Sequence, residues 1–190
     1  MFVTGFHRAG THTFAKELAS KVGLPYVEEG KVKWDDFYLA KTLIQKHKCV
    51  IQCPGLAHKT LYLAKLGKVY WCDRDKLSIV TAMRNGGIDE MAWHIMNNFY
   101  NEFPDDPIWD TLEYDGSEDQ HYGFVKYKSL LVKVKEHFYQ TKFKDVCEYI
   151  KLEDQDFYDF EKSMTFKKPL RATLCLIAIV IAIILKGLKI

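Results

Sequence analysis

The feature that most constrains the fold is a short apolar segment that runs into a loop bounded by two glycines. Residues 2–4 are Phe-Val-Thr, and residues 13–22 show apolar side chains at helical spacing. Between them, residues 5–13 read Gly-Phe-His-Arg-Ala-Gly-Thr-His-Thr. A strand, a tight glycine turn and a helix in this order aim several backbone N–H groups and a helix N-terminus at one point. Such a concavity is expected to bind phosphate or sulfate.

Apolar, strand-like segments alternate with amphipathic helical segments over most of the chain. The expected strands are residues 2–4, 26–27, 49–53, 69–72 and 146–152, and the expected helices are residues 13–22, 34–46, 59–66, 75–84, 88–103 and 124–139. Strands separated by helices pair in parallel through right-handed crossovers. The sequence therefore predicts an α/β domain over residues 1–165, with three layers around a parallel sheet.

The charge balance and the cysteines exclude several classes of protein. Lys and Arg total 27 and Asp and Glu total 25, so the net charge is only +2, which argues against a nucleic-acid partner. Five cysteines without regular spacing make no disulfide framework and no zinc site, and no metal is expected. The N-terminus lacks the basic and apolar segments of a secretory signal, so we expect a cytoplasmic body.

The loop carries its own candidate anion-binding groups. Its glycines are spaced as in a Walker A loop, but Thr11 and His12 stand where a kinase or ATPase has Lys and then Ser or Thr. The lysine that contacts the β- and γ-phosphates and the hydroxyl that holds Mg²⁺ are thus missing from their usual positions. Arg8 adds a cation that can grip an oxyanion with two hydrogen bonds. The candidate residues are Arg8, Ala9, Gly10, Thr11, His12 and Thr13.

Residues 8–13, Arg-Ala-Gly-Thr-His-Thr, resemble the 5′-phosphosulfate loop of the sulfotransferase family. Residues 69–75, a strand followed by Arg-Asp, and residues 149–154, a strand ending in Glu-Asp, are similar to two later segments of that family. The resemblance spans residues 1 to about 160. It implies a parallel sheet of the P-loop NTPase and sulfotransferase type, with 3′-phosphoadenosine-5′-phosphosulfate as co-substrate.

The resemblance also implies roles for residues beyond the loop. Arg74 and a hydroxyl about two helical turns later would hold the 3′-phosphate of the donor. The position eight residues after Arg74 is Ala82, so Ser78 or Thr81 would supply that hydroxyl, and the family's proline after Arg-Asp is replaced by Lys76.

The catalytic base is implied less directly. Many members carry a Lys-Thr-His segment at the end of the third strand, where this chain has Gln-Cys-Pro at residues 52–54. His58 follows closely and is the candidate base. It would take the proton of a hydroxyl or amine on a small-molecule or glycan acceptor, while Arg8 and the loop amides stabilise charge on the transferring group.

Two other functions remain open. One is a P-loop nucleotide or small-molecule kinase, with Arg74 and Arg84 on a mobile lid and with Mg²⁺-dependent ATP binding. The other is a catalytically degenerate, membrane-tethered binding module, which the missing Lys-Thr-His segment favours.

The end of the chain, residues 166–190, is set apart by an uncharged apolar run at residues 173–185. As a helix, this run would reach about 20 Å, short of the roughly 30 Å of a bilayer core. Residues 170–190, with Arg171 and Lys186 reaching toward the interfaces, would make a marginal span. A C-terminal membrane anchor, a buried core segment and an oligomer helix are the three interpretations.

Residues 104–120 hold seven acidic residues and no regular apolar spacing. They are expected to be irregular, either as a solvated loop or as a flap over a ligand site.

Overall fold

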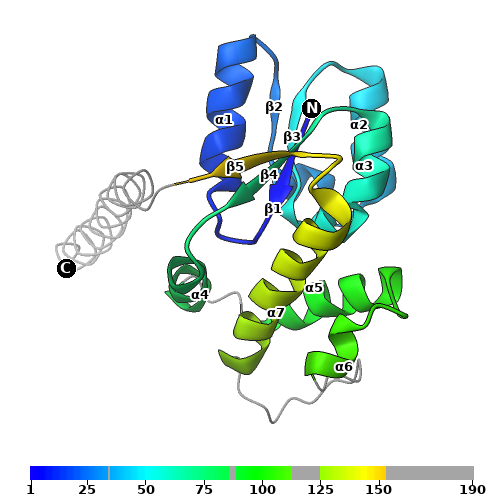
Figure 1. Cartoon of the computed structure of the whole chain (residues 1–190). Coiled ribbons are helices and arrows are strands. Elements are labelled where there is room, and N and C mark those ends of the chain that lie inside the picture. The colour runs from blue at the N-terminus through cyan, green and yellow to red at the C-terminus, as the bar shows by residue number, and fades with distance from the viewer. Residues whose placement is uncertain (34, 86–88, 113–124, 153–190) are drawn as a thin grey trace, which may run out of the picture. The chain divides into compact units, whose positions relative to one another are not determined.

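The computed structural model describes residues 1–33, 35–85, 89–112 and 125–152, all of them within one compact unit, Met1–Leu152 (Figure 1). The apolar segment predicted at residues 166–190, its boundary with the domain, and acidic residues 113–120 lie outside the described residues. In the part that is described, no helix is long and apolar enough to span a membrane.

Five parallel strands form one sheet in the order β2-β3-β1-β4-β5. The strands are β1 (Phe2–Gly5), β2 (Tyr26–Val27), β3 (Val50–Gln52), β4 (Val69–Asp73) and β5 (Glu148–Lys151). The α-helices are α1 (Thr11–Val22), α2 (Phe37–Lys46), α3 (Thr60–Leu66), α4 (Lys76–Asn85), α5 (Asp89–Glu102), α6 (Ile108–Leu112) and α7 (Val125–Phe138). Two 3₁₀ segments, η1 (Glu29–Val32) and η2 (Pro54–Lys59), and one π-helical turn, η3 (Tyr139–Phe143), complete the elements of the described ranges. The predicted α/β class is confirmed.

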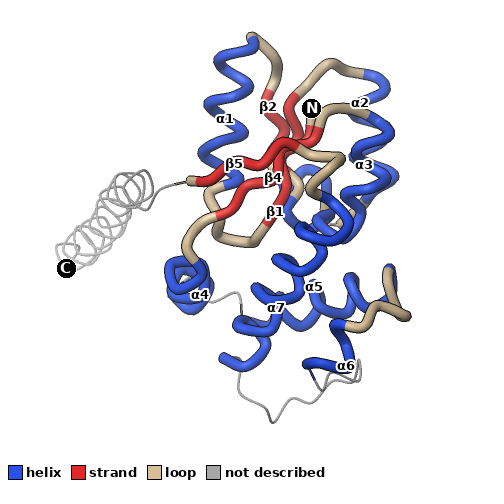
Figure 2. The backbone as a smooth tube through the Cα atoms, viewed as in Figure 1, coloured by secondary structure: helices blue, strands red, loops and turns tan. Residues whose placement is uncertain are grey.

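The sheet separates two apolar cores because successive strand side chains point to opposite faces. Phe2 packs in one core with Ala40 and Leu63 from α2 and α3, whereas Val3 packs in the other with Ala15 of α1. Figure 2 shows the sheet in red, with α1 on one side and α2 and α3 on the other. β1 is buried along its whole length, as expected of a central parallel strand covered on both faces.

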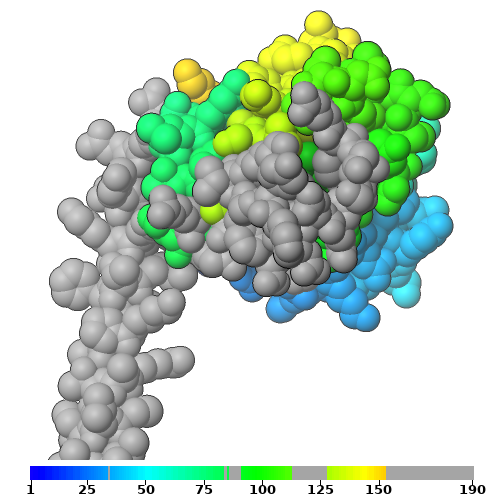
Figure 3. Space-filling view, turned by 90° about the horizontal axis from the view of Figure 1, so that it is seen from below, coloured from blue at the N-terminus to red at the C-terminus, as the bar shows by residue number. Residues whose placement is uncertain are grey.

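Helices α5 and α7 lie beyond the carboxyl end of β1 (Figure 1). They are joined to each other by aromatic packing. The rings of Phe99 and Phe138 stack with centroids 5.1 Å apart, and Phe103 stacks on Phe138 at 4.7 Å. Seen from this end, the surface of α5 and α6, in green, lies beside that of the first part of the chain, in blue (Figure 3).

The stretch predicted to be irregular contains a short helix, α6, because its acidic residue Asp106 is not solvated. The Asp106 side chain is 4 % exposed and accepts hydrogen bonds from His137 Nε2 at 2.8 Å and Lys142 Nζ at 3.0 Å. It also accepts one from the backbone N–H of Ile108 at 3.1 Å, which begins the helix. The interpretation of a solvated loop is therefore wrong for Asp106, since three donors compensate its burial.

The helix predicted from residue 34 begins instead at Phe37, where Asp36 caps it. The Asp36 carboxylate accepts from the Leu39 N–H at 2.8 Å. Replacing Asp36 with Ala is expected to lower the free energy of unfolding by about 1 kcal/mol, because one N–H of the first turn loses its partner. Urea unfolding measures this loss. Asp36→Asn should recover most of it, and an equal loss in both variants would contradict the capping role.

Candidate functional site

The loop between β1 and α1, residues 5–11, is called the anion loop below. Three of its residues have positive φ: Gly5 at 130°, Arg8 at 66° and Gly10 at 82°. Gly5 is required by close packing as well as by its φ, since a Cβ there would lie 2.2 Å from the backbone oxygen of Cys72 on β4. Arg8 carries a Cβ and lacks the conformational freedom of glycine, so its positive φ stores strain. Backbone strain of this kind is often found where a loop binds a ligand.

The anion loop leaves several donors unused. Ala9 N–H bonds to the Phe6 carbonyl at 3.1 Å and closes a tight turn. Among the described residues, no partner is found for the backbone N–H groups of Arg8, Gly10 and Thr11. These groups lie at the positive end of the α1 dipole. Unpaired N–H groups at a helix N-terminus are suited to binding an oxyanion; that this loop binds one stays a prediction.

Thr11 and His12 stand where a kinase loop has lysine and a hydroxyl residue, and a chain of hydrogen bonds holds them in place. Thr11 is buried, and its oxygen accepts from Gln52 Nε2 at 3.3 Å. Gln52 Oε1 accepts from the Tyr26 hydroxyl at 2.8 Å, and the Tyr26 oxygen lies 2.8 Å from His12 Nδ1. Because the Tyr26 proton is given to Gln52, His12 donates through Nδ1. Burial, together with the charge of Lys16, lowers the pKa of His12.

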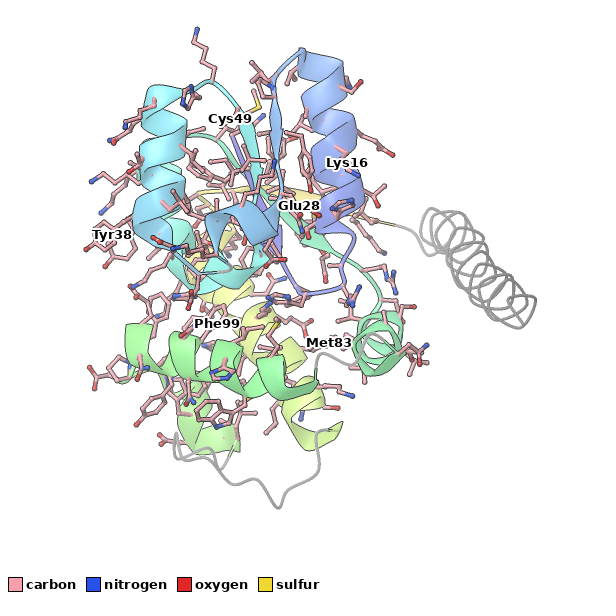
Figure 4. The ribbon with its side chains drawn as sticks, turned by 180° about the vertical axis from the view of Figure 1, so that it is seen from behind. Lys16, Glu28, Tyr38, Cys49, Met83 and Phe99 are labelled. Carbon is pink, nitrogen blue, oxygen red and sulfur yellow. The ribbon has the colours of Figure 1, made fainter. Side chains whose placement is uncertain are left out.

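Glu29 is the first of two candidate site residues that were not predicted from the sequence. It follows β2, and its Oε1 accepts from the Gly55 N–H at 3.1 Å. Burial raises the pKa of Glu29 to about 7, although Lys135 and Arg8 pull it down. Its neighbour Glu28 is labelled at the end of β2 in Figure 4. A carboxylate with a pKa near neutrality, close to the cations of the anion loop, is suited to accept a proton from a reacting hydroxyl.

The second missed residue is Lys135 of α7. Its side chain is fully buried, and its Nζ donates to the Gly5 carbonyl at 3.0 Å. Burial lowers the pKa of Lys135 to about 7, against the opposing effect of Glu29. A signal was present in the sequence, because Lys135 lies three or four positions from the apolar residues Leu131 and Phe138 and so falls on the buried face of the helix.

His58, the base predicted from sequence, lies in η2 and is 6 % exposed. Its ring contacts that of Phe99 with centroids 6.1 Å apart. Burial and the charge of Lys59 lower the pKa of His58 to about 3. Its affinity for a proton is therefore far below that of Glu29, whose pKa is about 7. The assignment of His58 stays a prediction, with less support from the geometry than Glu29 has.

The residues predicted to hold a 3′-phosphate are brought together only in part. Arg74 is buried directly after β4, which pairs with β1, so Arg74 and the anion loop lie at the same edge of the sheet. Ser78 lies one helical turn further and is half-buried, its N–H bonding to the Asp75 carboxylate at 3.0 Å. Thr81 is exposed to solvent. Ser78 is thus the better-placed hydroxyl, and the side chain of Arg84 lies outside the described residues.

No group of three His, Cys, Asp or Glu side chains within the described residues is arranged to hold a metal ion. Cys53 is fully buried, and burial raises the pKa of its thiol. A protonated thiol is a poor metal ligand.

No protein-family model matches the chain, and no curated protein matches it either. Among solved structures, it is similar to shikimate kinase from Bacteroides thetaiotaomicron, with 11 % identity over 79 % of this chain and 83 % of the other, and a TM-score of 0.43. It is also similar to shikimate kinase from Acinetobacter baumannii in complex with shikimate, with 13 % identity over 87 % and 93 % and a TM-score of 0.41. At this level of similarity neither structure supports a particular substrate.

The assignment of the fold rests on the chain itself. A glycine loop joins the central strand to the first helix at the carboxyl edge of a parallel sheet ordered β2-β3-β1-β4-β5. The chain has an α/β fold with a five-stranded parallel sheet and a glycine loop between β1 and α1.

Proposed function

We propose that the chain binds an anionic nucleotide at the anion loop and transfers a charged group from it to a hydroxyl acceptor. One observation supports this above the others: the half-buried carboxylate of Glu29 lies within electrostatic reach of Arg8 in the loop and of Lys135 on α7. An oxyanion site and a base with a pKa near 7 are the two parts that such a transfer needs.

We propose 3′-phosphoadenosine-5′-phosphosulfate as the donor. Residues 8–13 fit the phosphosulfate loop, and Arg74 lies at the same edge of the sheet, where a 3′-phosphate would need a cation. The acceptor oxygen attacks sulfur and forms the new S–O bond. The bond from sulfur to the bridging oxygen breaks, and its electrons leave with 3′-phosphoadenosine-5′-phosphate. The acceptor proton passes to Glu29, and Arg8 stabilises the transferring oxygens.

A second candidate is phosphoryl transfer from ATP, which one observation favours. The ammonium group of Lys135 lies against the first residue of the anion loop, so a lysine charge is present although the loop sequence lacks it. This function predicts Mg²⁺-dependent binding of ATP, which sulfuryl transfer does not require.

Titration calorimetry of the full chain with 3′-phosphoadenosine-5′-phosphate tests the proposal. We expect binding without Mg²⁺, weakened at least about tenfold by Arg8→Ala, because a charge-assisted hydrogen bond to the anion is lost. Lys21→Ala, at the exposed end of α1, is the matched control and should bind normally.

Other outcomes discriminate among the functions. Binding of ATP with Mg²⁺ alone would favour phosphoryl transfer, whereas binding of the nucleotide with no turnover of a donor would favour a binding module. Absence of binding to either nucleotide, or binding indifferent to Arg8→Ala, would refute the anion loop as the site.

A further inference from the structure

The anion loop has beside it a positive charge that does not come from its own residues. The position after Gly10, where a kinase loop carries lysine, is occupied by Thr11, which is buried and bonded to Gln52. Arg8 is the one lysine or arginine between Gly5 and Thr11. A transferring sulfuryl or phosphoryl group bears several negative oxygens, and one cation leaves much of that charge without a partner.

Lys135 reaches this loop from a distant part of the chain, 130 positions away in sequence. Its Nζ bonds to the Gly5 carbonyl, and the ammonium lies 5.9 Å from the centre of the Phe6 ring. An ammonium group has three donors, and the Gly5 carbonyl is the one hydrogen-bond acceptor found for it among the described residues. Lys135 therefore keeps donor capacity beside the anion loop.

The position of Lys135 is costly for stability. Four other lysines, Lys59, Lys68, Lys76 and Lys142, form ion pairs with carboxylates. Lys135 is fully buried and makes no ion pair within the described residues. An apolar side chain of similar length would be better tolerated there by the folded state. A buried cation held at a loop that binds anions is more readily explained by ligand binding than by folding.

We propose that Lys135 supplies the ammonium group that pairs with the oxyanion in the anion loop, in place of the lysine that the loop lacks. This inference rests on the proposed anion binding, and it applies equally to a sulfuryl and to a phosphoryl donor.

The neighbours of Lys135 give the proposal a pH dependence. Glu29 in η1, His7 in the anion loop and His58 in η2 are the titratable groups that interact with it. Burial lowers the pKa of Lys135 to about 7, so part of the unliganded protein holds it neutral. A bound anion stabilises the charged form, so binding takes up a proton, and affinity should fall as the pH rises above 7.

The variant Lys135→Met tests the role of Lys135 directly. We expect it to weaken binding of 3′-phosphoadenosine-5′-phosphate at least tenfold at pH 7, while the melting temperature stays equal or rises. Lys133→Met is the matched control, because Lys133 is exposed on the same helix; it should change neither quantity. Equal affinity in Lys135→Met and wild type would overturn the inference and leave the proposed function standing.

A second measurement keeps the test valid if Lys135→Met folds poorly. Inorganic sulfate keeps the same charge from pH 6.5 to 9.5, and its affinity can be followed by NMR titration. In a Glu29→Gln background, which removes the other group with a pKa near 7, affinity should fall by up to about tenfold per pH unit above neutrality. A flat profile would overturn the inference. Failure of wild type to bind any of these anions would overturn the proposed function and the inference together.

Discussion

Replacing Glu29 with Gln is expected to lower the turnover number of the transfer reaction by about 10²–10⁴-fold, the usual contribution of a positioned base. The amide has nearly the shape of the carboxylate, and its oxygen can still accept from the Gly55 N–H. Binding of the nucleotide should therefore change little. Steady-state kinetics with donor and hydroxyl acceptor would separate the loss in kcat from any change in KM.

The pH profile identifies the base. Since the pKa of Glu29 is raised to about 7, wild-type kcat at saturating donor should rise with pH through 7 as the carboxyl loses its proton, and the Gln variant should lack this rise. Glu28→Gln, at the exposed neighbouring position, is the control and should keep wild-type kinetics. If His58→Gln abolished turnover while Glu29→Gln did not, the base predicted from sequence would be the correct one.

The same pKa shift has a consequence for stability. A carboxyl group whose pKa is raised on folding contributes stability that is fully present below its ordinary pKa and is lost as the pH rises through the folded value. For Glu29 that window lies between its ordinary pKa of 4.5 and about 7. The Gln variant should therefore be more stable than wild type at pH 8. A higher stability of the variant would exclude misfolding as the cause of its lost turnover.

Replacing Gly5 with Ala is expected to lower the free energy of unfolding by about 3–5 kcal/mol, from steric overlap and backbone strain combined. The added Cβ would lie 2.2 Å from Cys72 O and 2.9 Å from Cys72 N. Both atoms are backbone of β4, which pairs with β1 in register at Gly5 and Cys72. Relief of the overlap would require the two strands to move apart. Urea unfolding measures the loss.

Gly23 provides the control for the effect of φ alone. It caps the C-terminus of α1 at φ 66°, and no atom lies within 4 Å of its ideal Cβ. Gly23→Ala should cost only about 1–2 kcal/mol, the penalty of the left-handed conformation. Equal losses at Gly5 and Gly23 would show that the close approach of β1 to β4 is not what requires glycine at Gly5.

The order of the strands and helices could be predicted from the sequence because each element is encoded locally. Helical spacing, apolar strands and glycine stops identify every strand and most helices to within a few residues. The exception, α6, depends on Asp106, whose partners are His137 of α7 and Lys142 of η3. Nothing in the local sequence distinguishes this buried aspartate from its solvated neighbours.

The same distinction, between features encoded locally and features that depend on tertiary contacts, applies to the candidate site. By itself the sequence determined the anion loop, because a glycine turn between a strand and a helix is a local property with a fixed set of backbone angles. Only the tertiary structure decided that Glu29 and Lys135 join that loop. The parallel sheet brings the ends of β1, β2 and β3 to one edge, and α7 packs beyond it. Burial there moves both pKa values toward 7, since desolvation disfavours a charge whichever part of the chain carries it.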